Sequence, residues 1–596
     1  MRTFRRILSF ITTTTLCLSL QCFSSNVVIA QEACGSKISL ELLETLTESD
    51  NDDLIPICIW SNDINYDTVK DITLKNTGLS EEIIINSSYG LYKQLSSNDI
   101  QSIEEKTALK DFERINTFYD ANKSEIKKLS LDVDTYISEK RAIARDEYDR
   151  QNKEFVDKYL RGARIEFISS YAPMIICEVT KEKIKELDNI ETVESLSLYE
   201  NLEGFNLGNM DISIPSIKGD YVRDVKGYKG AGVNIGQIEE GRPQNGVTEL
   251  VNTSITKGGT IYDDYHASLV AAIIAGSSGM VPQAHLYCTT ADNFFQNAEW
   301  LISSNVTVIN CSYAYTNYGT YDNIAKWVDH IVNQHNVTWV QASGNDGPDG
   351  YVLSPGNAYN TITVGAIDDN GTISESDDTY ASFTSYNVGS GMPEKPDVLA
   401  PGVGFSVSGG PVWQGTSFAT PHVTGMVAQM MYFMPTLKLR PDAVKAAVLA
   451  SCDRKVTSET MSYISSKEGA GVVNAINAIS AINNVAVQNI FYNTTASTID
   501  YIYSPTTTGT KTFAISWLRQ NTGTGTNHSS ISVPSFTDFD LVVYDSLGNL
   551  VIISQPPYNS TELVRFTAYS GSTYTIRIKR FTNNSTLEKI ALAYVD

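Results

Sequence analysis

The stretch between residues 228 and 480 constrains the fold more than any other part of the chain. Short apolar runs alternate there with amphipathic helical segments, and the runs read "VNIGQI", "AHLYCTT", "VTVINCSY", "VTWVQASG" and "TITVGAI". Within residues 321–336, helical spacing places on one face Ile324, Trp327, Val328, Ile331 and Val332. Continuous apolar strands separated by such helices predict an α/β fold with a parallel central sheet covered on both sides. Functional sites in such folds gather beyond the carboxyl ends of the strands.

The flanking stretches have different patterns. Residues 38–204 begin with a strand-like "LIPICIW" and end with "MIICEVTKEKIKELDNIETVESLSLY", which predicts a strand, an amphipathic helix and a strand of a small α+β unit. Between about 95 and 161, helical spacing amid dense mixed charge predicts one or two long solvated helices inserted into that unit, with a structural role. After about residue 490, side chains alternate in "FDLVVYDSLGNLVIIS" and "STYTIRIKR", which predicts an antiparallel β-sandwich.

The amino terminus and the net charge bear on location and partners. Residues 1–30 combine Arg2, Arg5 and Arg6 with an apolar run and a small residue at Ala30, the layout of a secretory signal peptide. An uncleaved membrane anchor is the alternative, but threonines dilute the run and it barely reaches the roughly 20 residues that a span needs. The net charge of −23 argues against nucleic acid and anionic membranes as partners. We therefore expect a secreted, extracellular protein.

The chain has eight cysteines, of which Cys17 and Cys22 would leave with the signal peptide. The other six lack the paired spacing of a disulfide framework or a zinc site. They are Cys34, Cys58, Cys177, Cys288, Cys311 and Cys452. We expect these to be buried free thiols.

Ser417 lies in "VWQGTSFATPHVTG", among small residues and four positions ahead of Pro421, which suits the first turn of a helix. A serine hydroxyl is a weak nucleophile unless a base removes its proton and preformed donors receive the oxyanion. His266 heads the amphipathic segment "HASLVAAIIAG", which places its ring near strand ends. A lone histidine is more often structural than catalytic, so His266 is a candidate base only together with its partners.

Two further segments supply such partners. Asn345 follows an apolar strand in "VQASGNDG", where a turn through Gly344 can present its side-chain amide to an oxyanion. An ordinary turn asparagine is the alternative. The strand "VNIGQI" leads into Glu239 and Glu240, so a carboxylate that holds an imidazole is available at the end of an early strand.

Together these segments resemble the subtilisin-like serine peptidases, or subtilases, over roughly residues 205–485. "GTSFATPHVTG" is similar to the family's nucleophile motif, "HASLVAAIIAG" with "GMVPQAHLY" to its histidine motif, and "ASGN" and "KPDVLAPG" to two further signatures. The resemblance implies a subtilisin-like three-layer fold and a serine endopeptidase that works through an acyl-enzyme. It implies Ser417 as nucleophile, His266 as general base and Asn345 as oxyanion donor.

The acid departs from the family pattern. Where subtilases have aspartate, this chain has glutamate, and we assign the role of orienting His266 to Glu239. Asp263 and Asp264, just before the histidine, are less suited substitutes. A displacement of about an ångström can cost on the order of a hundredfold in rate if it is left uncompensated.

The resemblance also implies the substrate-binding residues. Ser312, Tyr313 and Ala314 follow a strand and correspond to the edge that pairs with the substrate backbone, which we expect Tyr313 and Tyr315 to crowd. Ala342, Ser343 and Gly344, with Leu353 as the floor, correspond to the primary specificity pocket. We expect a shallow apolar pocket that excludes large aromatic and basic side chains.

By the same resemblance, residues 31–204 correspond to an inhibitory propeptide that aids folding and is cut off between Glu200 and Pro215. The catalytic domain then covers residues 205–488, and the β-sandwich at 489–596 weakly resembles pre-peptidase C-terminal domains. No cofactor is required. Three acidic residues of the sandwich are candidate Ca²⁺ ligands, although solvated turn carboxylates are the more common case: Asp538, Asp540 and Asp545.

Other functions stay open at this stage. The glutamate and the tyrosine-rich edge are compatible with a catalytically weak or inactive relative that acts as a binding or regulatory protein. The sedolisin relatives use glutamate, but they carry aspartate where this chain has Asn345 and an acid where it has His266. An α/β-hydrolase lipase needs glycine where this chain has Ala419.

Overall fold

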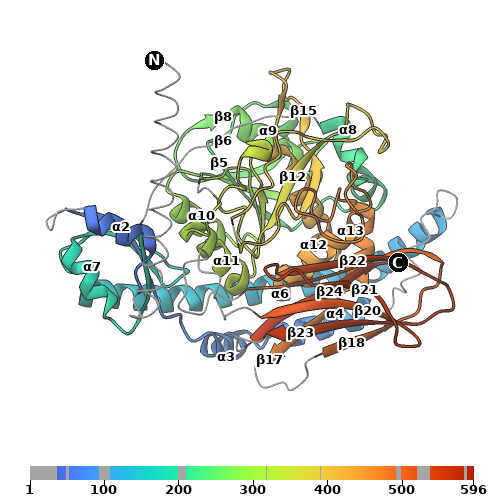
Figure 1. Cartoon of the computed structure of the whole chain (residues 1–596). Coiled ribbons are helices and arrows are strands. Elements are labelled where there is room, and N and C mark those ends of the chain that lie inside the picture. Colours follow the sequence, from blue (N-terminus) through green and yellow to red (C-terminus); the bar gives the residue numbers. More distant parts are fainter. Residues whose placement is uncertain are drawn as a thin grey trace, which may run out of the picture. The chain divides into compact units, whose positions relative to one another are not determined.

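The computed structural model covers the whole chain and describes residues 37–48, 53–92, 108–198, 210–316, 319–389, 391–491, 498–519, 537–582 and 587–596 (Figure 1). The chain divides into two compact units. The described residues of the first unit are 37–48, 53–64 and 148–198, and all other described residues belong to the second. The expected signal peptide and Cys34 lie outside the described residues.

The first unit is a four-stranded antiparallel sheet in the order β2-β3-β1-β4. Its elements are α2 (Leu40–Glu48), β1 (Ile55–Ser61), β2 (Arg164–Ile168), β3 (Met174–Val179), α7 (Lys181–Asp188) and β4 (Val193–Leu198). Thr180 caps α7 by accepting a hydrogen bond from the backbone N–H of Lys183, and Ile184 and Leu187 of that helix are buried. The predicted strand–helix–strand pattern is confirmed.

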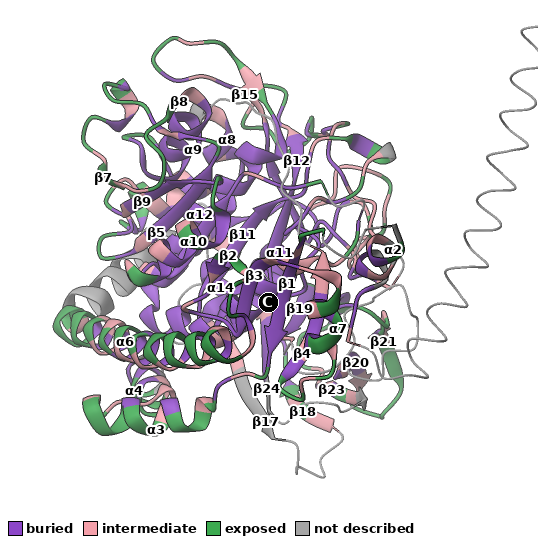
Figure 2. Ribbon diagram, turned by 90° about the vertical axis from the view of Figure 1, so that its left-hand side faces the viewer, coloured by how far each residue is buried: buried purple, intermediate pink, exposed green. Residues whose placement is uncertain are grey.

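The second unit is built around an eight-stranded sheet in the order β13-β12-β11-β10-β5-β9-β7, with β14 also paired to β12. Its strands are β5 (Asn234–Glu239), β7 (Ser254–Lys257), β9 (His285–Thr290), β10 (Val308–Cys311), β11 (Thr338–Ala342), β12 (Ile362–Asp368), β13 (Thr379–Tyr380) and β14 (Val398–Pro401). Every pairing is parallel except that of β12 with β13. The predicted parallel central sheet is confirmed, and β10 and β11 are buried along their whole length. Figure 2 shows β11 in purple.

Helices pack on the sheet in two groups. The first group shares one apolar core: α9 (Tyr265–Ala275), α12 (Thr416–Phe433), α13 (Pro441–Ser451) and α14 (Ala475–Asn483). The second group, α10 (Phe294–Ser303) and α11 (Asn323–His335), packs against β9 and β11 through a cluster of aromatic rings that includes Phe294, Trp327 and Trp339. The predicted amphipathic helix over 321–336 is therefore confirmed as α11.

Several short elements complete the unit. They are α8 (Met210–Ser216), β6 (Arg242–Pro243), β8 (Asp263–Asp264), β15 (Val403–Phe405), β16 (Trp413–Gln414) and the helical turns η1 (Tyr221–Val225), η2 (Thr248–Leu250), η3 (Gly347–Asp349) and η4 (Pro435–Leu439). β6 pairs with β8, and β15 pairs with β16. The helix α8 is buried through Ser213, Ile214 and Ser216.

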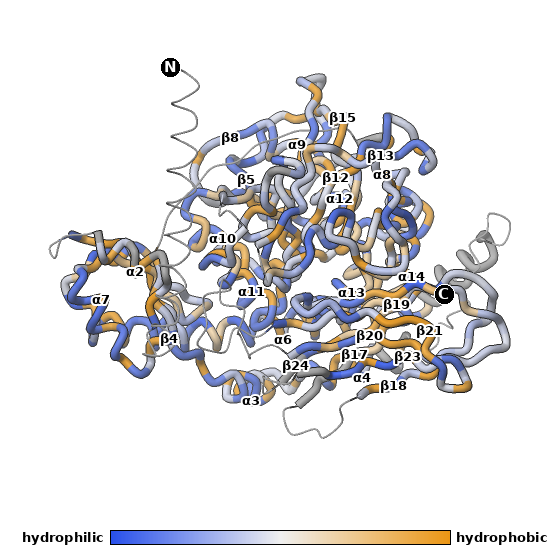
Figure 3. The backbone as a smooth tube through the Cα atoms, in the orientation of Figure 1, coloured by the Kyte–Doolittle hydropathy of each residue, from blue (hydrophilic) through white to orange (hydrophobic). Residues whose placement is uncertain are grey.

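The carboxyl-terminal residues form two four-stranded antiparallel sheets, in the orders β17-β24-β19-β22 and β18-β23-β20-β21. The strands are β17 (Ala486–Phe491), β18 (Thr498–Tyr503), β19 (Gly509–Trp517), β20 (Asp538–Asp545), β21 (Leu550–Ser554), β22 (Thr561–Ala568), β23 (Tyr574–Thr582) and β24 (Leu587–Val595). One apolar cluster takes residues from both sheets, and Figure 3 shows hydrophobic segments along β20 and β23 in orange. The predicted antiparallel sheets are confirmed, and α13 packs against β19 and β24.

The predicted insertion at about 95–161 contains the 52-residue helix α6 (Ala108–Tyr159), and two shorter helices precede it, α3 (Tyr66–Thr77) and α4 (Glu81–Tyr92). The predicted long helix is confirmed, whereas the prediction that it is a solvated helix is wrong. Although α6 exposes one side (Figure 2, green), a buried stripe runs along the other: Ile126, Leu129, Val133, Tyr136, Ile137, Lys140, Arg141, Ala144 and Tyr148. These positions follow helical spacing, but the dense charge around them hides the stripe in the sequence. Residues 65–147 belong to the second unit.

Two further expectations concern thiols and membranes. The five described cysteines, Cys58, Cys177, Cys288, Cys311 and Cys452, are free and buried, as predicted. In the part of the chain that the structure describes, none of the helices has both the length and the apolar character that crossing a bilayer requires.

Candidate active site

The four segments singled out in the sequence meet at one edge of the central sheet. β5 ends at Glu239 and β11 ends at Ala342, and because β5, β10 and β11 are parallel, their carboxyl ends lie at the same edge. The helices α9 and α12 pack against each other, and their first turns carry His266 and Ser417. This edge is where an open parallel sheet places its functional side chains.

Glu239 and His266 form a buried pair. Nδ1 of His266 lies 2.8 Å from Oε2 of Glu239, and both side chains are almost completely excluded from solvent. Asp264 instead caps α9 by accepting a hydrogen bond from the backbone N–H of Ala267 at 2.8 Å. Asp263 lies near Arg242 and Lys257. The glutamate is therefore the carboxylate that meets the imidazole in this structure.

The environment favours the protonated form of His266. Burial lowers the pKa of His266, but the Glu239 carboxylate, with smaller contributions from Asp264 and Glu240, outweighs burial and raises this pKa above its usual value. The ring also packs edge-on against Phe418 at 5.0 Å between centroids, which places the imidazole beside the first turn of α12. Nε2 is buried and, among the described residues, makes no hydrogen bond. This atom is thus available to exchange a proton.

Ser417 and Ser312 hold each other by two hydrogen bonds. Oγ of Ser417 donates to the carbonyl oxygen of Ser312 at 3.1 Å, and Oγ of Ser312 donates to the carbonyl oxygen of Ser417 at 2.7 Å. The second bond has a local cause. In a regular helix the Ser417 carbonyl accepts from the N–H four residues later, and Pro421 has none. Pro421 was expected in the first turn of the helix; because α12 begins at Thr416, it lies in the second turn, which corrects that expectation.

Asn310 connects the acid with the nucleophile helix. Its Nδ2 donates to Oγ of Ser312 at 2.9 Å and lies 3.5 Å from Oε1 of Glu239, while its Oδ1 accepts from Oγ1 of Thr424 at 2.9 Å. Asn310 is fully buried. Asn310 was not among the predicted site residues; an amide inside the apolar run "VTVINCSY" is a weak signal for it, because buried polar groups need partners.

Asn345 lies directly beside the nucleophile. It follows Gly344, whose φ of 109° suits glycine, and its Oδ1 accepts from the backbone N–H of Thr416 at 2.8 Å and from Oγ1 of the same residue at 3.0 Å. These bonds engage the oxygen of the amide, so its NH₂ group remains as the donor. The first turn of α12 adds backbone N–H groups that lack partners within the helix.

The predicted substrate edge follows β10. Ser312 and Ala314 are buried and Tyr313 is half-buried, with its carbonyl accepting from Nε2 of Gln341 at 2.7 Å. Tyr315 is buried: its hydroxyl donates to the carbonyl of Ala291 and its backbone pairs with Ser354. Its ring packs edge-on against that of Tyr313, with 5.1 Å between the centroids.

The predicted pocket residues lie side by side. The backbone N–H of Leu353 donates to the carbonyl of Ser343 at 3.2 Å. A Cβ added at Gly344 would lie 3.0 Å from Cγ of Leu353, which measures how closely the two residues approach. The structure therefore brings the segment 342–344 and Leu353 together, with an aliphatic side chain against a glycine.

Tyr265 was not predicted from the sequence. It links the segment that carries His266 with the segment that leads to Ser417. Its ring packs edge-on against Trp413 of β16, and its hydroxyl bonds the backbone of Val407 at 3.1 Å. It stands next to His266, whereas Trp413 lies four residues before Ser417. The residue thereby fixes the hairpin that leads to the nucleophile against the start of α9.

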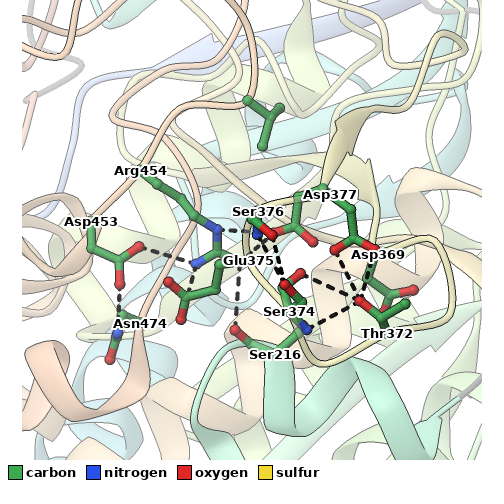
Figure 4. A network of polar contacts seen from close by, with 12 residues as sticks. Ser216, Asp369, Thr372, Ser374, Glu375, Ser376, Asp377, Asp453, Arg454 and Asn474 are labelled. Atoms are coloured by element: carbon green, nitrogen blue, oxygen red, sulfur yellow. Dashed lines mark hydrogen bonds and ion pairs between the residues drawn. The ribbon is translucent and has the colours of Figure 1, made fainter.

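A second polar cluster lies around the loop after β12 (Figure 4). Arg454 contacts Asp378 at 2.6 Å and Asp453 at 3.1 Å, and Oγ1 of Thr372 donates to Asp377 at 2.9 Å. Burial raises the pKa of Asp369 in the same loop to about 6. The cluster fastens this loop to the segment after α13, since its carboxylates are held by Arg454 and by loop neighbours.

The acidic residues of the sandwich are also engaged. Asp545 accepts from the backbone N–H groups of Leu547 and Asn549 in its own turn, and Asp540 lies 3.7 Å from Nζ of Lys579. Burial raises the pKa of Asp538 to about 6. Across the residues that the structure describes, no three His, Cys, Asp or Glu side chains are grouped as metal ligands.

Part of this chain is similar to known proteins. Residues 210–471 match the Subtilase family, Peptidase S8. The chain is 38% identical to serine protease AprX of Bacillus subtilis (strain 168) over 157 residues, which are 23% of this chain and 34% of AprX. It is 30% identical to subtilisin-like protease 2 of Trichophyton rubrum over 263 residues, which are 39% of this chain and 56% of that protein.

The chain thus spans about a third of AprX and somewhat more than half of the fungal protease. Among solved structures, the prenylagaramide maturation protease PagA matches 43% of this chain and 96% of its own, with 22% identity and a TM-score of 0.36. The patellamide maturation protease PatA matches 42% and 96%, with 23% identity and a TM-score of 0.34. The match to the Subtilase family covers residues 210–471, the part of this chain that carries the site, and it concerns that part alone.

Proposed function

We propose that this protein is a serine endopeptidase that hydrolyses peptide bonds of protein substrates through an acyl-enzyme. One observation carries the proposal: a buried carboxylate, Glu239, lies 2.8 Å from Nδ1 of His266, and the ring of His266 packs against the residue that follows Ser417. An acid, an imidazole and an alcohol in this order are the parts of a serine protease triad. The subtilase match and the named protease relatives support the same activity.

In the proposed reaction, Oγ of Ser417 turns from the Ser312 carbonyl and attacks the carbonyl carbon of the scissile bond while Nε2 of His266 takes its proton. The imidazolium then gives this proton to the leaving amine, and the acyl-enzyme forms. A water, deprotonated by the same nitrogen, attacks the ester and releases the acid, which restores Ser417. Glu239 keeps a proton on Nδ1 and stabilises the imidazolium by its charge.

The amide NH₂ of Asn345 and the backbone N–H of Ser417 are the proposed donors to the oxyanion. Asn345 is held from its oxygen side by two bonds to Thr416, so its position is set before the substrate arrives. Donors that need no reorganisation during the reaction give the largest electrostatic contribution to such steps.

The substrate backbone is proposed to pair with residues 312–314, and its side chain before the cut bond to enter the pocket made by Ala342, Ser343, Gly344 and Leu353. Leu353 packs against Gly344, which supports a shallow apolar pocket. Small aliphatic side chains fit such a pocket better than arginine or tyrosine.

We further propose that the protein is secreted and is made as a zymogen whose residues 31–204 act as inhibitor and folding aid. A slow parallel fold gains from such help. Ser213, Ile214 and Ser216 of α8 are buried, and Oγ of Ser213 lies 2.8 Å from Nε2 of His422, a residue of the nucleophile helix. A cut on the amino-terminal side of Met210 leaves these contacts intact, which narrows the proposed window between Glu200 and Pro215.

The activity is tested by labelling the purified protein with a fluorophosphonate. Such a probe reacts with an activated serine, so the wild type is expected to be labelled and the Ser417→Ala variant is not. In parallel, the wild-type precursor is expected to trim itself and the variant to stay intact. An unlabelled, untrimmed wild type with a native circular dichroism spectrum would reject the peptidase and favour a binding or regulatory subtilase-like protein.

A further inference from the structure

The proposed function leaves residues 65–147 without a role; this segment, which contains α3, α4 and most of α6, is the helical insertion as the structure defines it. It falls within the proposed propeptide, yet it belongs to the same compact unit as the catalytic residues. The contacts that it makes there decide whether it can leave when the propeptide is cut.

Arg141 of α6 is 3% exposed and makes several hydrogen bonds to the catalytic unit. Its Nε and Nη2 donate to the carbonyl of His335 at 3.0 and 2.8 Å, and its Nη1 donates to the carbonyls of Val306 at 2.9 Å and Ile302 at 3.3 Å. His335 ends α11, and Ile302 lies in the last turn of α10. Carbonyls at helix ends lack partners within the helix, and a cation there also complements the helix dipole.

A buried group of charges also connects the insertion with the rest of the unit. Lys140 lies 3.2 Å from Oε1 of Glu81, and Lys589 of β24 lies 3.9 Å from Oε2 of the same glutamate. Although burial opposes it, Lys589 and Lys140 hold the pKa of Glu81 well below its usual range. Asp134 of α6 pairs with Lys438 of η4 at 2.8 Å. Removal of the insertion would leave Lys589 and Lys438 without these partners, and a buried charge that loses its partner is strongly unfavourable.

The insertion also shares the apolar core of the catalytic unit. Seven of its buried residues belong to the cluster that contains α9 and α12: Ile84, Leu91, Ile126, Leu129, Val133, Tyr136 and Ile137. α4 packs against η4, which joins α12 to α13. Apolar surface on both partners would return to water if the insertion left.

We propose that residues 65–147 stay bound to the catalytic unit after the propeptide is cut, as a permanent non-covalent subunit of the mature enzyme. The proposal rests on the proposed maturation, because only a cut makes the two pieces separable. Release of inhibition is then confined to propeptide residues outside 65–147. On this proposal, the many charged residues of the insertion solvate its exposed side, whereas its buried side packs against the catalytic unit.

The test separates retention from catalysis. The full chain with Ser417→Ala receives a recognition sequence for a site-specific protease between Glu200 and Asn209, and the purified protein is cut with that protease. We expect gel filtration in high salt to show one species, in which intact mass spectrometry finds the fragment with residues 65–147 and the catalytic chain in equal amounts. Buried ion pairs are screened little by salt. Separate elution of the fragment from a catalytic chain with an unchanged melting temperature overturns the proposal.

This readout does not depend on an active serine, so a protein that fails fluorophosphonate labelling can still retain the fragment, and the two proposals fail independently. A pair of variants sharpens the test. Arg141→Ala is expected to speed dissociation of the cut fragment by roughly tenfold or more, since several buried carbonyls lose their donor. Arg150→Ala, on the same helix and paired with Glu154 at an exposed position, is the matched control and is expected to leave the rate unchanged. Equal dissociation rates for the two variants count against the interface; if Arg141→Ala does not fold, the cut of the parent protein decides alone.

Discussion

Ser312 and Ser417 exchange hydrogen bonds in both directions, hydroxyl to carbonyl, across 105 positions of the sequence. The exchange ties the end of β10 to the first turn of α12, at the point where Pro421 leaves a helical carbonyl without its usual donor. The carbonyl of the nucleophile is therefore held by the side chain of the residue that directly follows β10.

Ser312→Ala is expected to lower kcat more than it changes KM, because the buried Ser417 carbonyl loses its donor and the nucleophile loses a fixed position. Stability should fall by about 1–3 kcal/mol, the cost of an unsatisfied buried polar group. Ser516→Ala is the matched control, since Oγ of Ser516 in β19 is buried and, within the described residues, makes no hydrogen bond. Thermal melting and steady-state kinetics on a peptide substrate measure both effects. Equal effects of the two substitutions would contradict this role of Ser312.

Glu239→Asp restores the family's residue and tests whether the site is built for the longer acid. The carboxylate now reaches Nδ1 of His266 at 2.8 Å while its second oxygen lies 3.5 Å from the Asn310 amide. Shortening the side chain withdraws both contacts by about an ångström, so kcat/KM is expected to fall roughly a hundredfold. A variant as active as the wild type would show that the surrounding residues do not depend on the extra methylene.

In the pH profile of kcat/KM, the fall on the acidic side should have its midpoint above the usual pKa of histidine. The general base must be neutral, and the pKa of His266 is raised by the Glu239 carboxylate, so kcat/KM falls as the pH drops through that raised value. Glu239→Gln removes the negative charge, and this midpoint is expected to move to lower pH while the plateau drops on the order of 10⁴-fold. The pH profile of kcat/KM for both proteins is the measurement, and an unmoved midpoint in the variant speaks against this pairing.

Asn345→Ala is expected to reduce kcat by about 10²–10³ with little change in KM, the usual result of removing one oxyanion donor. Some loss of stability should accompany it, because Thr416 loses the acceptor of its backbone N–H. Binding of a peptide to the Ser417→Ala variant with and without Asn345→Ala separates ground-state binding from transition-state stabilisation. If Asn345→Ala weakens peptide binding by the same factor as it lowers kcat/KM, Asn345 acts in substrate binding instead.

Cleavage of a peptide library is expected to show small aliphatic residues before the cut bond. Leu353 lies against Gly344 and narrows the pocket. Leu353→Gly should widen it and admit larger side chains, with a gain of roughly tenfold for aromatic residues relative to the parent, since each methylene in an apolar pocket counts for about 1–3 kcal/mol. Dominant arginine or tyrosine in the parent protein's profile would reject the pocket assignment.

The sequence was sufficient wherever the signal is local. The continuous apolar strands predicted the parallel sheet, because burial on both faces leaves no polar alternation. The segments around His266, Asn345 and Ser417 could be recognised because each motif is a short run of adjacent residues. The side chain that joins the Glu239 environment to the nucleophile helix, Asn310, carried only a weak signal, a single amide in an apolar run.

By itself, the amino-acid sequence determined the sheet, the helices that cover it, the terminal sandwich and the segments that carry the candidate triad, since these follow from periodicity and from contiguous motifs. Only the tertiary structure decided that Glu239 rather than Asp264 meets His266, that Ser312 supplies the donor that Pro421 lacks, and that Arg141 closes the ends of α10 and α11. Each of these is a contact between residues far apart in the chain. Which of several polar groups becomes the partner depends on distances of a few ångströms, and packing sets those distances.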